Sequence, residues 1–558
     1  MKFMNRILLL GINARYTHSN LAIRYLRNYL SKLDLQILLL ETSINSNTLN
    51  IVDKILNIKP DLIAISVYIW NHELVKKLIP ELHLALPKSG LILGGPEVSY
   101  TANIWFDEFP YLDHIICGPG EDALLNLLKN PDQKYDQILK MSNQPLDQLP
   151  FPYREDDFPE LLDKYLYYES SRGCSFKCSF CLSSRNDQKY EIRNLEIVKN
   201  ELRFMLKKNP LIIKFVDRTF NLEPERAREI WRYLFKIWNH KTKFHFEIRP
   251  ELLGREDIAL LEKIPDNMFR FEIGVQSVNK KTLKAINRFQ DFDSIAPKIL
   301  KLIKLGNIHI HVDLIAGLPY EDLDSLKNTF NRIYRLGANN LQFGFLKILF
   351  GTQIASETKK YGYLFSPNPP YHVIENKWIS VNEMADLRNF EHIFSSYYNS
   401  ENMKISLENL VDIYDDPFRF YQELTQFINP DFELPKAWNW TQKGELLLRF
   451  VNKIIPEKKA LIKDCLRWDW CWKAKSHRYP DFIQELKDSE IKKTGKVKLN
   501  SFIIDDFVQS DNVSFPKKLI NRCIFFKPFS KEFINKYLPD HELVCFFPTD
   551  SNKGILYL

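Results

Sequence analysis

The chain has 558 residues, and at about 150 residues per domain this length predicts three or four domains. Hydrophobic residues make up 45% and charged residues 26%, a composition that excludes an intrinsically disordered chain. The net charge of +7 permits an anionic partner without requiring one, and no apolar run is long enough to cross a membrane, so we expect a cytoplasmic protein.

The first domain is predicted to span residues 1–141, where short apolar runs alternate with amphipathic segments of helical period. Such alternation predicts a parallel sheet covered by helices on both faces, and five units indicate a doubly wound, flavodoxin-like α/β domain. Ligands of this architecture bind outside the carboxyl ends of the strands. The predicted strands are 7–13, 35–42, 61–69, 90–95 and 114–118.

Residues 142–164 hold four prolines and no clear period, which predicts a linker. From 165 to 355 the alternation resumes with six strand-like runs, which predicts a partial (β/α)6 barrel whose site lies at the carboxyl ends of its strands. Residues 356–558 lose this rhythm and predict a mainly helical C-terminal domain with a short mixed tail.

Three cysteines follow the first predicted barrel strand within eight residues, as Cys174-x3-Cys178-x2-Cys181. Three thiolates on one loop can bind three irons of a [4Fe–4S] cluster and leave the fourth iron open to another ligand. A structural zinc site is the alternative, but it normally has four protein ligands and no second cysteine pair is present. The spacing therefore favours an iron–sulfur cluster.

This CxxxCxxC loop, with Phe180 before its last cysteine, resembles the cluster loop of the radical S-adenosylmethionine (SAM) superfamily. The resemblance implies that the open iron chelates SAM, and that the cluster cleaves SAM reductively to a 5′-deoxyadenosyl radical. It extends over residues 165–350 and gives the three cysteines both catalytic and metal-binding roles. By the same resemblance, the residues expected to contact SAM are Phe180, Asp217, Thr219, Glu247, Arg249, Glu272, Gln276, Ser277, Ile315, Gly317 and Leu346.

A doubly wound domain ahead of such a barrel resembles the cobalamin-binding class of the superfamily. The DxHxxG signature that supplies an axial histidine in some cobalamin domains is absent, so His18 is either a cobalt ligand or a hydrogen-bonding residue. The alternative is a degenerate scaffold that binds no corrinoid. The residues expected to contact cobalamin are Asn13, His18, Ser66, Tyr68, Trp70, Asn71, Gly94, Gly95, Glu97, Gly118, Gly120 and Glu121.

The whole chain looks most like a subgroup of bacterial cobalamin-binding radical SAM proteins with a C-terminal domain of unknown function. That resemblance implies C-methylation, or another radical transformation, of an unknown substrate that the C-terminal domain selects. It also implies an electron donor such as flavodoxin or ferredoxin. An RNA-modifying radical SAM enzyme is one rival, although only Cys117 precedes residue 141, and a non-catalytic corrinoid or metal sensor is the other.

The segment 465–482 interleaves aromatic residues with lysine and arginine. Such a pattern can bind single-stranded nucleic acid, because aromatic rings stack on bases and the cations contact phosphates. A helix whose tryptophan and leucine stripe packs on the barrel is the simpler interpretation. The pattern therefore favours a packed helix and leaves nucleic-acid binding as the alternative.

Overall fold

The computed structural model describes residues 5–141, 144–184, 189–428, 438–473, 478–507, 522–548 and 553–557. The chain forms two compact units, the first made of Met1–Ala338 with Gln342–Met384 and the second of Asn339–Leu341 with Ala385–Leu558. None of the helices in the described ranges is both long and apolar enough to span a membrane.

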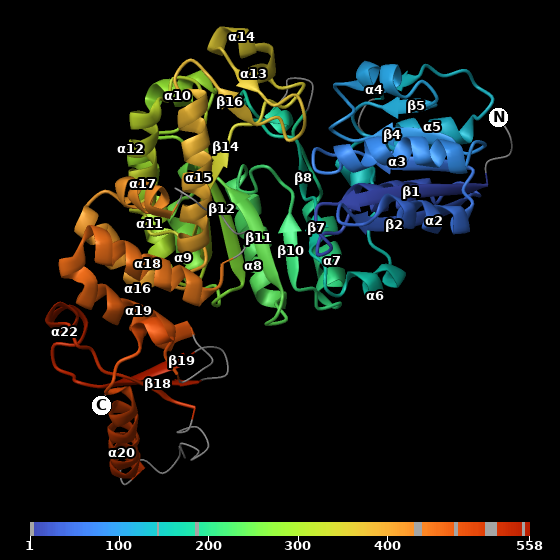
Figure 1. The fold of residues 1–558 in the computed structure, drawn as a ribbon. Helices are drawn as coiled ribbons and strands as arrows, with labels where there is room; N and C mark the ends of the chain where they lie inside the picture. The colour runs from blue at the N-terminus through green and yellow to red at the C-terminus, as the bar shows by residue number, and fades with distance from the viewer. Residues whose placement is uncertain are drawn as a thin grey trace. The chain divides into compact units, whose positions relative to one another are not determined.

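The first unit begins with a parallel six-stranded sheet in the order β2-β1-β3-β4-β5-β6, which confirms the flavodoxin-like prediction (Figure 1). The sixth strand was not predicted, because it is only two residues long and leaves no periodic signal. The strands are β1 (Arg6–Asn13), β2 (Gln36–Ser43), β3 (Leu62–Ser66), β4 (Gly90–Gly94), β5 (His114–Ile116) and β6 (Ile138–Leu139). The helices are α1 (Leu21–Leu30), α2 (Thr48–Ile58), α3 (His72–Ala85), α4 (Ala102–Glu108) and α5 (Glu121–Lys129).

Both faces of this sheet are buried. Helices α2, α3 and α4 contribute to an apolar cluster with one set of strand side chains, while α1 and α5 contribute to a second cluster with the alternate set. Burial on both sides explains why the strands are continuous apolar runs, with Leu8, Leu9 and Leu10 all fully buried. The polar loops that follow β1, β3, β4 and β5 therefore share one edge of the domain.

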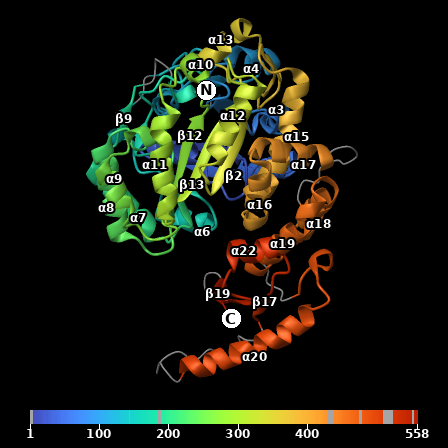
Figure 2. The ribbon, with the colours of Figure 1, turned by 90° about the vertical axis from the view of Figure 1, so that its left-hand side faces the viewer.

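The second sheet of this unit is the partial barrel, in the order β14-β13-β12-β11-β10-β7, with helices outside its curve (Figure 2). Its strands are β7 (Leu166–Tyr168), β10 (Ile212–Phe215), β11 (Lys243–Ile248), β12 (Phe269–Gln276), β13 (His309–Ala316) and β14 (Asn340–Phe345). The helices that follow them include α7 (Leu195–Leu206), α8 (Pro224–Ile237), α9 (Arg255–Leu261), α10 (Lys280–Ala285), α11 (Phe292–Leu305) and α12 (Leu323–Tyr334). Shorter elements are α6 (Phe158–Leu161), β8 (Ser171–Arg172), β9 (Glu191–Ile192), α13 (Gln353–Ser356), α14 (Thr358–Tyr361), β15 (Leu364–Phe365) and β16 (Val373–Glu375).

The barrel strands alternate strictly between two environments. On β11, Phe244, Phe246 and Ile248 are at most 3% exposed, whereas His245 and Glu247 between them occupy the opposite face. An ordinary β/α barrel fills its interior with branched apolar side chains, but this interior is polar and partly accessible. The interior of this barrel is therefore built to receive ligands as well as to pack.

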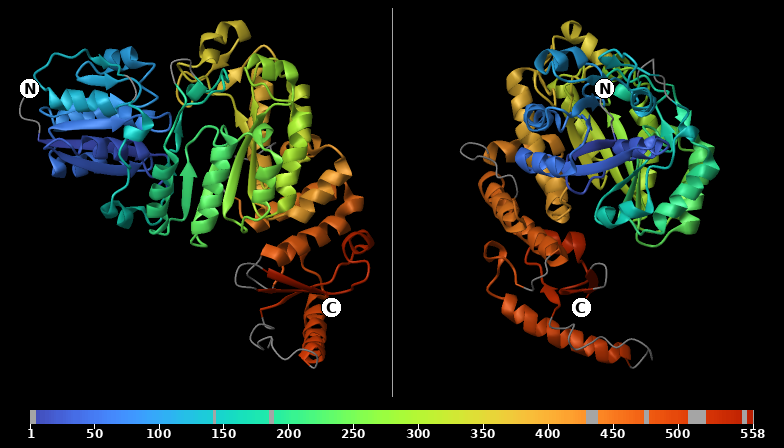
Figure 3. Two further views of the ribbon diagram at one scale, coloured as in Figure 1. Left: turned by 180° about the vertical axis from the view of Figure 1, so that it is seen from behind. Right: turned by 90° about the vertical axis from the view of Figure 1, so that its right-hand side faces the viewer.

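The second unit is mainly helical, with a small antiparallel sheet in the order β17-β18-β19 (Figure 3). Its elements are α15 (Val381–Tyr398), α16 (Lys404–Tyr414), α17 (Pro417–Ile428), α18 (Trp440–Ile454), α19 (Lys459–Lys473), α20 (Asp488–Phe507), β17 (Ile524–Phe526), α22 (Lys531–Tyr537), β18 (Val544–Pro548) and β19 (Lys553–Tyr557); α15 begins in the first unit. The aromatic segment at 465–482 includes the end of α19. Trp468 packs on Phe526 and Phe546, and Trp470 packs on Trp440. The tryptophans form core contacts, as the simpler interpretation predicted, but with this sheet and with α18 instead of the barrel.

Candidate functional site

The three cysteines lie on the loop after β7, at the carboxyl ends of the barrel strands. Cys174 and Cys178 are buried and Cys181 is partly buried. The loop is fixed at Ser179, whose amide donates to the Ile286 carbonyl at 2.9 Å and whose carbonyl accepts from the Ile354 amide at 2.9 Å. Two segments far away in sequence therefore hold the loop between them.

Gly173 gives the loop its direction. It has a φ of +82°, and a Cβ there would lie 2.5 Å from the Lys189 carbonyl oxygen, so only glycine fits. Cys174 Sγ then lies 3.8 Å from Thr219 Oγ1 at the end of β10. In the described ranges, no three His, Cys, Asp or Glu side chains are arranged to hold a single metal ion.

Two buried arginines flank this loop. The Arg249 guanidinium lies 3.6 Å from the ring centre of Phe176, and Arg288 Nη1 lies 3.7 Å from Cys178 Sγ. Burial raises the pKa of the Cys178 thiol, while the charges of Arg288 and Arg249 act to lower it. An anionic group bound by the loop would therefore meet positive charge, which fits a thiolate-ligated cluster.

Several residues expected to bind SAM present accessible or unsatisfied groups to the barrel interior. Gln276 has a φ of +70° next to a register shift between β12 and β13, and its buried Oε1 has no hydrogen-bond partner. Glu247 keeps 33% of its side chain exposed, with Arg218 at 3.6 Å. Burial raises the pKa of Glu247 to about 7 and Arg218 opposes that rise. An orphaned amide oxygen and an under-compensated carboxylate fit a ligand that donates hydrogen bonds, as the amino and ribose groups of SAM do.

Other members of the expected SAM set are engaged by the protein. Both Asp217 oxygens accept hydrogen bonds from Ser170 and Ser171, and burial raises the pKa of this carboxyl to about 6. Ser277 donates to Glu321 at 2.6 Å. The Gly317 carbonyl accepts from Tyr363 and Asn376, and the Leu346 backbone pairs with Ala316 and Val373. These groups are therefore hydrogen-bonded within the protein and support the site's structure.

The barrel interior also holds three residues outside the expected SAM set, His245, His311 and Asp313. His245 Nε2 lies 2.9 Å from Glu272 Oε2, and His311 Nε2 lies 3.1 Å from Asp313 Oδ1. Burial alone would raise the pKa of Glu272, but the hydrogen bond and charge of His245 hold it at about 2. The alternation on β13 could have revealed Asp313, since it shares a face with Ile315 two residues later.

The edge of the N-terminal domain differs, because most of its polar candidates are already bonded. Asn71 is fully buried; its amide donates to the carbonyls of Ile12 and Ser66, and its oxygen accepts from the Tyr68 amide. Glu97 accepts from His72 and Tyr371. The remaining bonded candidates are Asn13, whose amide donates to the His18 carbonyl, Ser66, which bonds Asn20 and the Leu10 carbonyl, and Glu121, which pairs with Arg172.

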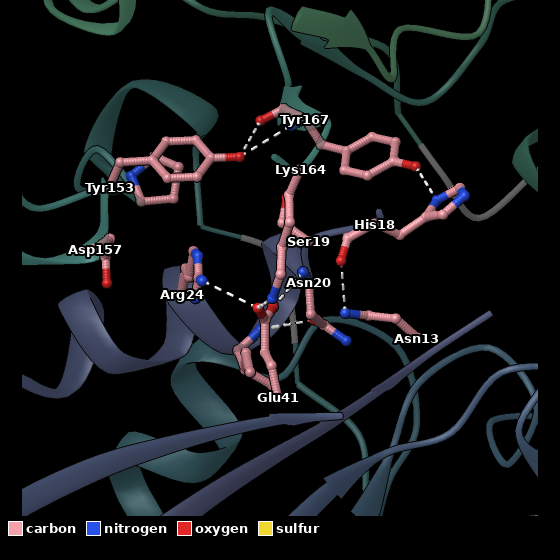
Figure 4. Close-up of polar contacts among 12 residues, drawn as sticks. Asn13, His18, Ser19, Asn20, Arg24, Glu41, Tyr153, Asp157, Lys164 and Tyr167 are labelled. Carbon is pink, nitrogen blue, oxygen red and sulfur yellow. Dashed lines mark hydrogen bonds and ion pairs between the residues drawn. The ribbon is translucent and has the colours of Figure 1, made fainter. Parts of the chain in front are cut away.

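His18 is bonded to the barrel (Figure 4). Its Nδ1 lies 2.5 Å from the Tyr167 hydroxyl, while the Tyr165 amide donates to the Thr17 carbonyl beside it. Burial and the charge of Lys214 lower the pKa of His18, which favours the neutral imidazole. This contact uses Nδ1 and leaves Nε2 for a metal, so it is compatible with both predicted roles of His18.

The other cobalamin candidates at this edge are aromatic rings and glycines. Trp70 is 43% exposed and stacks on Tyr68, with ring centroids 4.4 Å apart and planes 7° from parallel. Gly118 has a φ of +94° and open space where a side chain would lie, and Gly120 begins α5. Gly95, which follows Gly94 at the end of β4, has a φ of +110°, and a Cβ there would lie 2.5 Å from the Val67 carbonyl oxygen. Planar rings and bare backbone suit a large flat cofactor with a phosphate-bearing tail.

The linker is ordered where it joins the two domains. Arg27 of α1 makes two hydrogen bonds to Asp157, at 2.6 and 2.7 Å, and the Tyr153 hydroxyl bonds both backbone groups of Tyr167. Glu41, at the end of β2, pairs with Lys164 at 3.2 Å (Figure 4). Residues of the linker therefore bond to α1, to β2 and to the first barrel strand.

Fold and site together define a partial-barrel protein with a cysteine loop at its strand ends and a doubly wound domain before it. Residues 168–333 match the family described as "Radical SAM superfamily" and residues 7–128 match "B12 binding domain". Residues 359–546 match "Protein of unknown function (DUF4080)". The chain therefore carries a B12-binding domain followed by a radical SAM domain, and these domains imply a [4Fe–4S] cluster, SAM and cobalamin as cofactors.

Curated relatives resemble about half of the chain. The chain is 23% identical over 317 residues to the cobalamin-dependent radical SAM methyltransferase TokK of Streptomyces tokunonensis, covering 50% of this chain and 46% of that protein. It is 22% identical over 314 residues to the anaerobic magnesium-protoporphyrin IX monomethyl ester cyclase of Rubrivivax gelatinosus, covering 50% of this chain and 55% of that protein. The chain spans about half the length of these curated relatives.

Solved structures share the fold. The cobalamin-dependent SAM radical enzyme OxsB with aqua-cobalamin bound aligns at a TM-score of 0.60 and 16% identity, covering 88% of this chain and 81% of that one. The methyltransferase TsrM of Kitasatospora setae, with cobalamin and a [4Fe–4S] cluster bound, aligns at a TM-score of 0.54 and 14% identity, covering 84% and 99%. At these identities the likeness establishes the fold alone.

Proposed function

We propose that this protein is a cobalamin-dependent radical SAM enzyme that methylates an unactivated carbon of its substrate. The observation that carries the proposal is the cysteine loop: Cys174, Cys178 and Cys181 at the strand ends, with the buried guanidinium of Arg288 directed at Cys178. Three thiolates ligate three irons and leave one for SAM. With both cofactors bound, the cluster supplies the electron that cleaves SAM, and cobalamin supplies a carrier for the methyl group.

The chain's own residues have separable tasks in this proposal. Gln276 and Glu247 receive polar groups of SAM, supported by the unpartnered Oε1 of Gln276 and the exposed carboxylate of Glu247. Asp217 holds the backbone of the first strand and orients the cysteine loop. Tyr68 and Trp70 receive the corrin ring on a flat surface. A flavodoxin or ferredoxin is the proposed electron donor, and the C-terminal unit is proposed to select the substrate.

The first test is cluster formation and SAM cleavage. Anaerobically reconstituted protein is expected to bind about four irons and, once reduced, to release 5′-deoxyadenosine from SAM. A Cys178→Ala variant is expected to do neither, since it keeps two of the three thiolates. Equal release from both proteins would reject the catalytic assignment, and a colourless zinc-loaded protein would reject the cluster.

The second test concerns cobalamin. After incubation with hydroxocobalamin and desalting, about one corrinoid per chain is expected to remain, and Trp70→Ala is expected to weaken retention about fivefold, since a stacked ring contributes on the order of 1 kcal/mol. Absence of retention by the unmodified protein would support a degenerate N-terminal domain. Retention without SAM cleavage would support a corrinoid sensor.

A further inference from the structure

Arg288 is a buried cation beside a cluster ligand. It lies between α10 and α11 and is 9% exposed; its Nη1 is 3.7 Å from Cys178 Sγ, its Nη2 donates to the Gly274 carbonyl, and its Nε donates to Gln290 Oε1 at 3.0 Å. Within the part of the chain that the structure describes, no carboxylate pairs with it: the neighbouring Glu251 and Asp313 pair with Arg249 and His311.

An arginine in this position needs an anion. A guanidinium stays charged at any pH at which the protein is folded, and burying it without a counter-charge is costly. The group it faces is the sulfur of Cys178, at 3.7 Å from Nη1. Binding iron makes that sulfur a thiolate, and the bound cluster would then supply the missing negative charge.

The position is held from three sides. The Arg288 amide donates to the Leu283 carbonyl at 2.9 Å, and Ile286, two residues earlier, accepts from the Ser179 amide next to Cys178. A Cβ at Gly274 would lie 3.3 Å from Arg288 Nη2, so glycine at this position leaves the guanidinium room to approach the strand. The turn that carries Arg288 and the loop that carries Cys178 are therefore fixed to each other.

We propose that Arg288 is a positioning residue that donates a hydrogen bond to the cluster-bound sulfur of Cys178 and raises the reduction potential of the [4Fe–4S] cluster. Reduction adds one electron to the cluster, and a fixed cation at this distance stabilises the reduced form more than the oxidised form. The inference rests on the proposed function, because it requires the cluster. It goes beyond that function because it gives a residue outside the cysteine motif a role in setting the reduction potential of the cluster.

The test is a redox titration of the reconstituted full-length protein without SAM, followed by the EPR signal of the reduced cluster. The variants are Arg288→Gln and Arg288→Lys, with Arg232→Gln as a control that removes the same charge from a half-exposed position on α8. At the wild-type midpoint, Arg288→Gln is expected to lower the ratio of reduced to oxidised cluster about tenfold, equivalent to about 59 mV for one electron. Arg288→Lys is expected to shift less in the same direction, and the control not at all.

An Arg288→Gln protein with a full cluster that titrates at the wild-type potential would overturn the inference. If that variant binds no iron, the lysine variant decides, because it keeps the charge but loses the planar geometry of the guanidinium: an unchanged potential there overturns the inference and a more negative one supports it. Absence of a cluster from the unmodified protein would instead defeat the proposed function.

Discussion

The barrel and the N-terminal domain both have their candidate sites at the carboxyl ends of parallel strands. The polar side chains at the cluster end of the barrel have fewer hydrogen-bond partners than those at the edge of the N-terminal domain. At the cluster end, the Gln276 amide oxygen is unpartnered and the Arg288 cation faces a thiol. At the N-terminal edge, the Asn71 side chain and the Oε1 atom of Glu97 are hydrogen-bonded within the protein. Unsatisfied polar groups mark the first site, whereas planar rings and glycines mark the second. A polar residue of a motif therefore indicates a ligand only when the folded protein leaves its hydrogen-bonding groups without a protein partner.

The largest expected effect on iron binding comes from the glycine that starts the cysteine loop. In Gly173→Val the new side chain would meet the Lys189 carbonyl, so the loop must move and bound iron is expected to fall about tenfold. Gly306→Ala is the control, because its φ of +74° imposes similar strain with open space around a new Cβ. Iron analysis after reconstitution measures both. A fully loaded Gly173→Val protein would show that the loop does not depend on this close approach.

A buried acid at the cluster end predicts a pH dependence. Glu321 is fully buried, and burial raises its pKa from 4.5 to about 7, opposed by hydrogen bonds from Ser277 and Thr329. The pKa of Glu321 is higher in the folded protein than in the unfolded chain. Its contribution to the free energy of unfolding is therefore fully present below pH 4.5 and is lost as the pH rises through 7. The loss is about 3 kcal/mol over that window.

Glu321→Gln removes this titration and keeps hydrogen-bonding groups in place. Urea unfolding of both proteins at pH 5, 6.5 and 8 isolates the effect, since every other group titrates alike in the two. The variant is expected to gain stability relative to the unmodified protein as the pH rises. A constant difference at all three values would mean that Glu321 does not titrate in this range.

A substitution of Asn71 tests whether the hydrogen-bonded polar residues at the N-terminal edge stabilise the fold. Asn71→Ala removes three hydrogen bonds at a fully buried position, so we expect a loss of about 2 kcal/mol in the free energy of unfolding of the N-terminal domain. Asn45→Ala, at an exposed position, is the control and should change stability by less than about 0.5 kcal/mol. If Asn71→Ala kept its stability but lost corrinoid retention, Asn71 would belong to the ligand site after all.

The smallest expected effect is at the contact between His18 of the N-terminal domain and Tyr167 of the barrel. Tyr167→Phe removes the hydroxyl bonded to His18 and should cost about 1 kcal/mol of stability while iron loading stays the same. Tyr16→Phe, on a side chain that is 70% exposed, is the matched control. Calorimetry and iron analysis give the two readouts. Loss of iron in Tyr167→Phe would show that the two sites are coupled more tightly than their geometry indicates.

Local patterns predicted much of this architecture. Continuous apolar runs predicted the parallel sheet of the N-terminal domain, since strands such as β3 are buried on both faces. The assignment of Cys174, Cys178 and Cys181 to a cluster stays a prediction from their spacing. The two-residue strand β6 escaped because it is too short to carry a period. The partners of α19 could not be predicted, because an aromatic stripe does not specify which surface it covers.

Arg288 shows the limit most clearly. It is 110 residues from Cys178, and nothing in its local sequence indicates that its side chain reaches a sulfur. The contact depends on the register of β12 and on the turn after α10, both of which arise only from the folded barrel. The same holds for His18, whose partner Tyr167 lies on a different domain.

The central claim is that three thiolates hold a [4Fe–4S] cluster with one iron open for SAM. Electron–nuclear double resonance on the reduced protein, mixed with SAM labelled with oxygen-17 in its carboxylate, tests this directly. A clear oxygen-17 hyperfine coupling to the cluster is the predicted result, and it should be absent from unlabelled SAM. A reduced four-iron cluster that shows no coupling to the labelled carboxylate would contradict the account, because the fourth iron would then be closed to SAM.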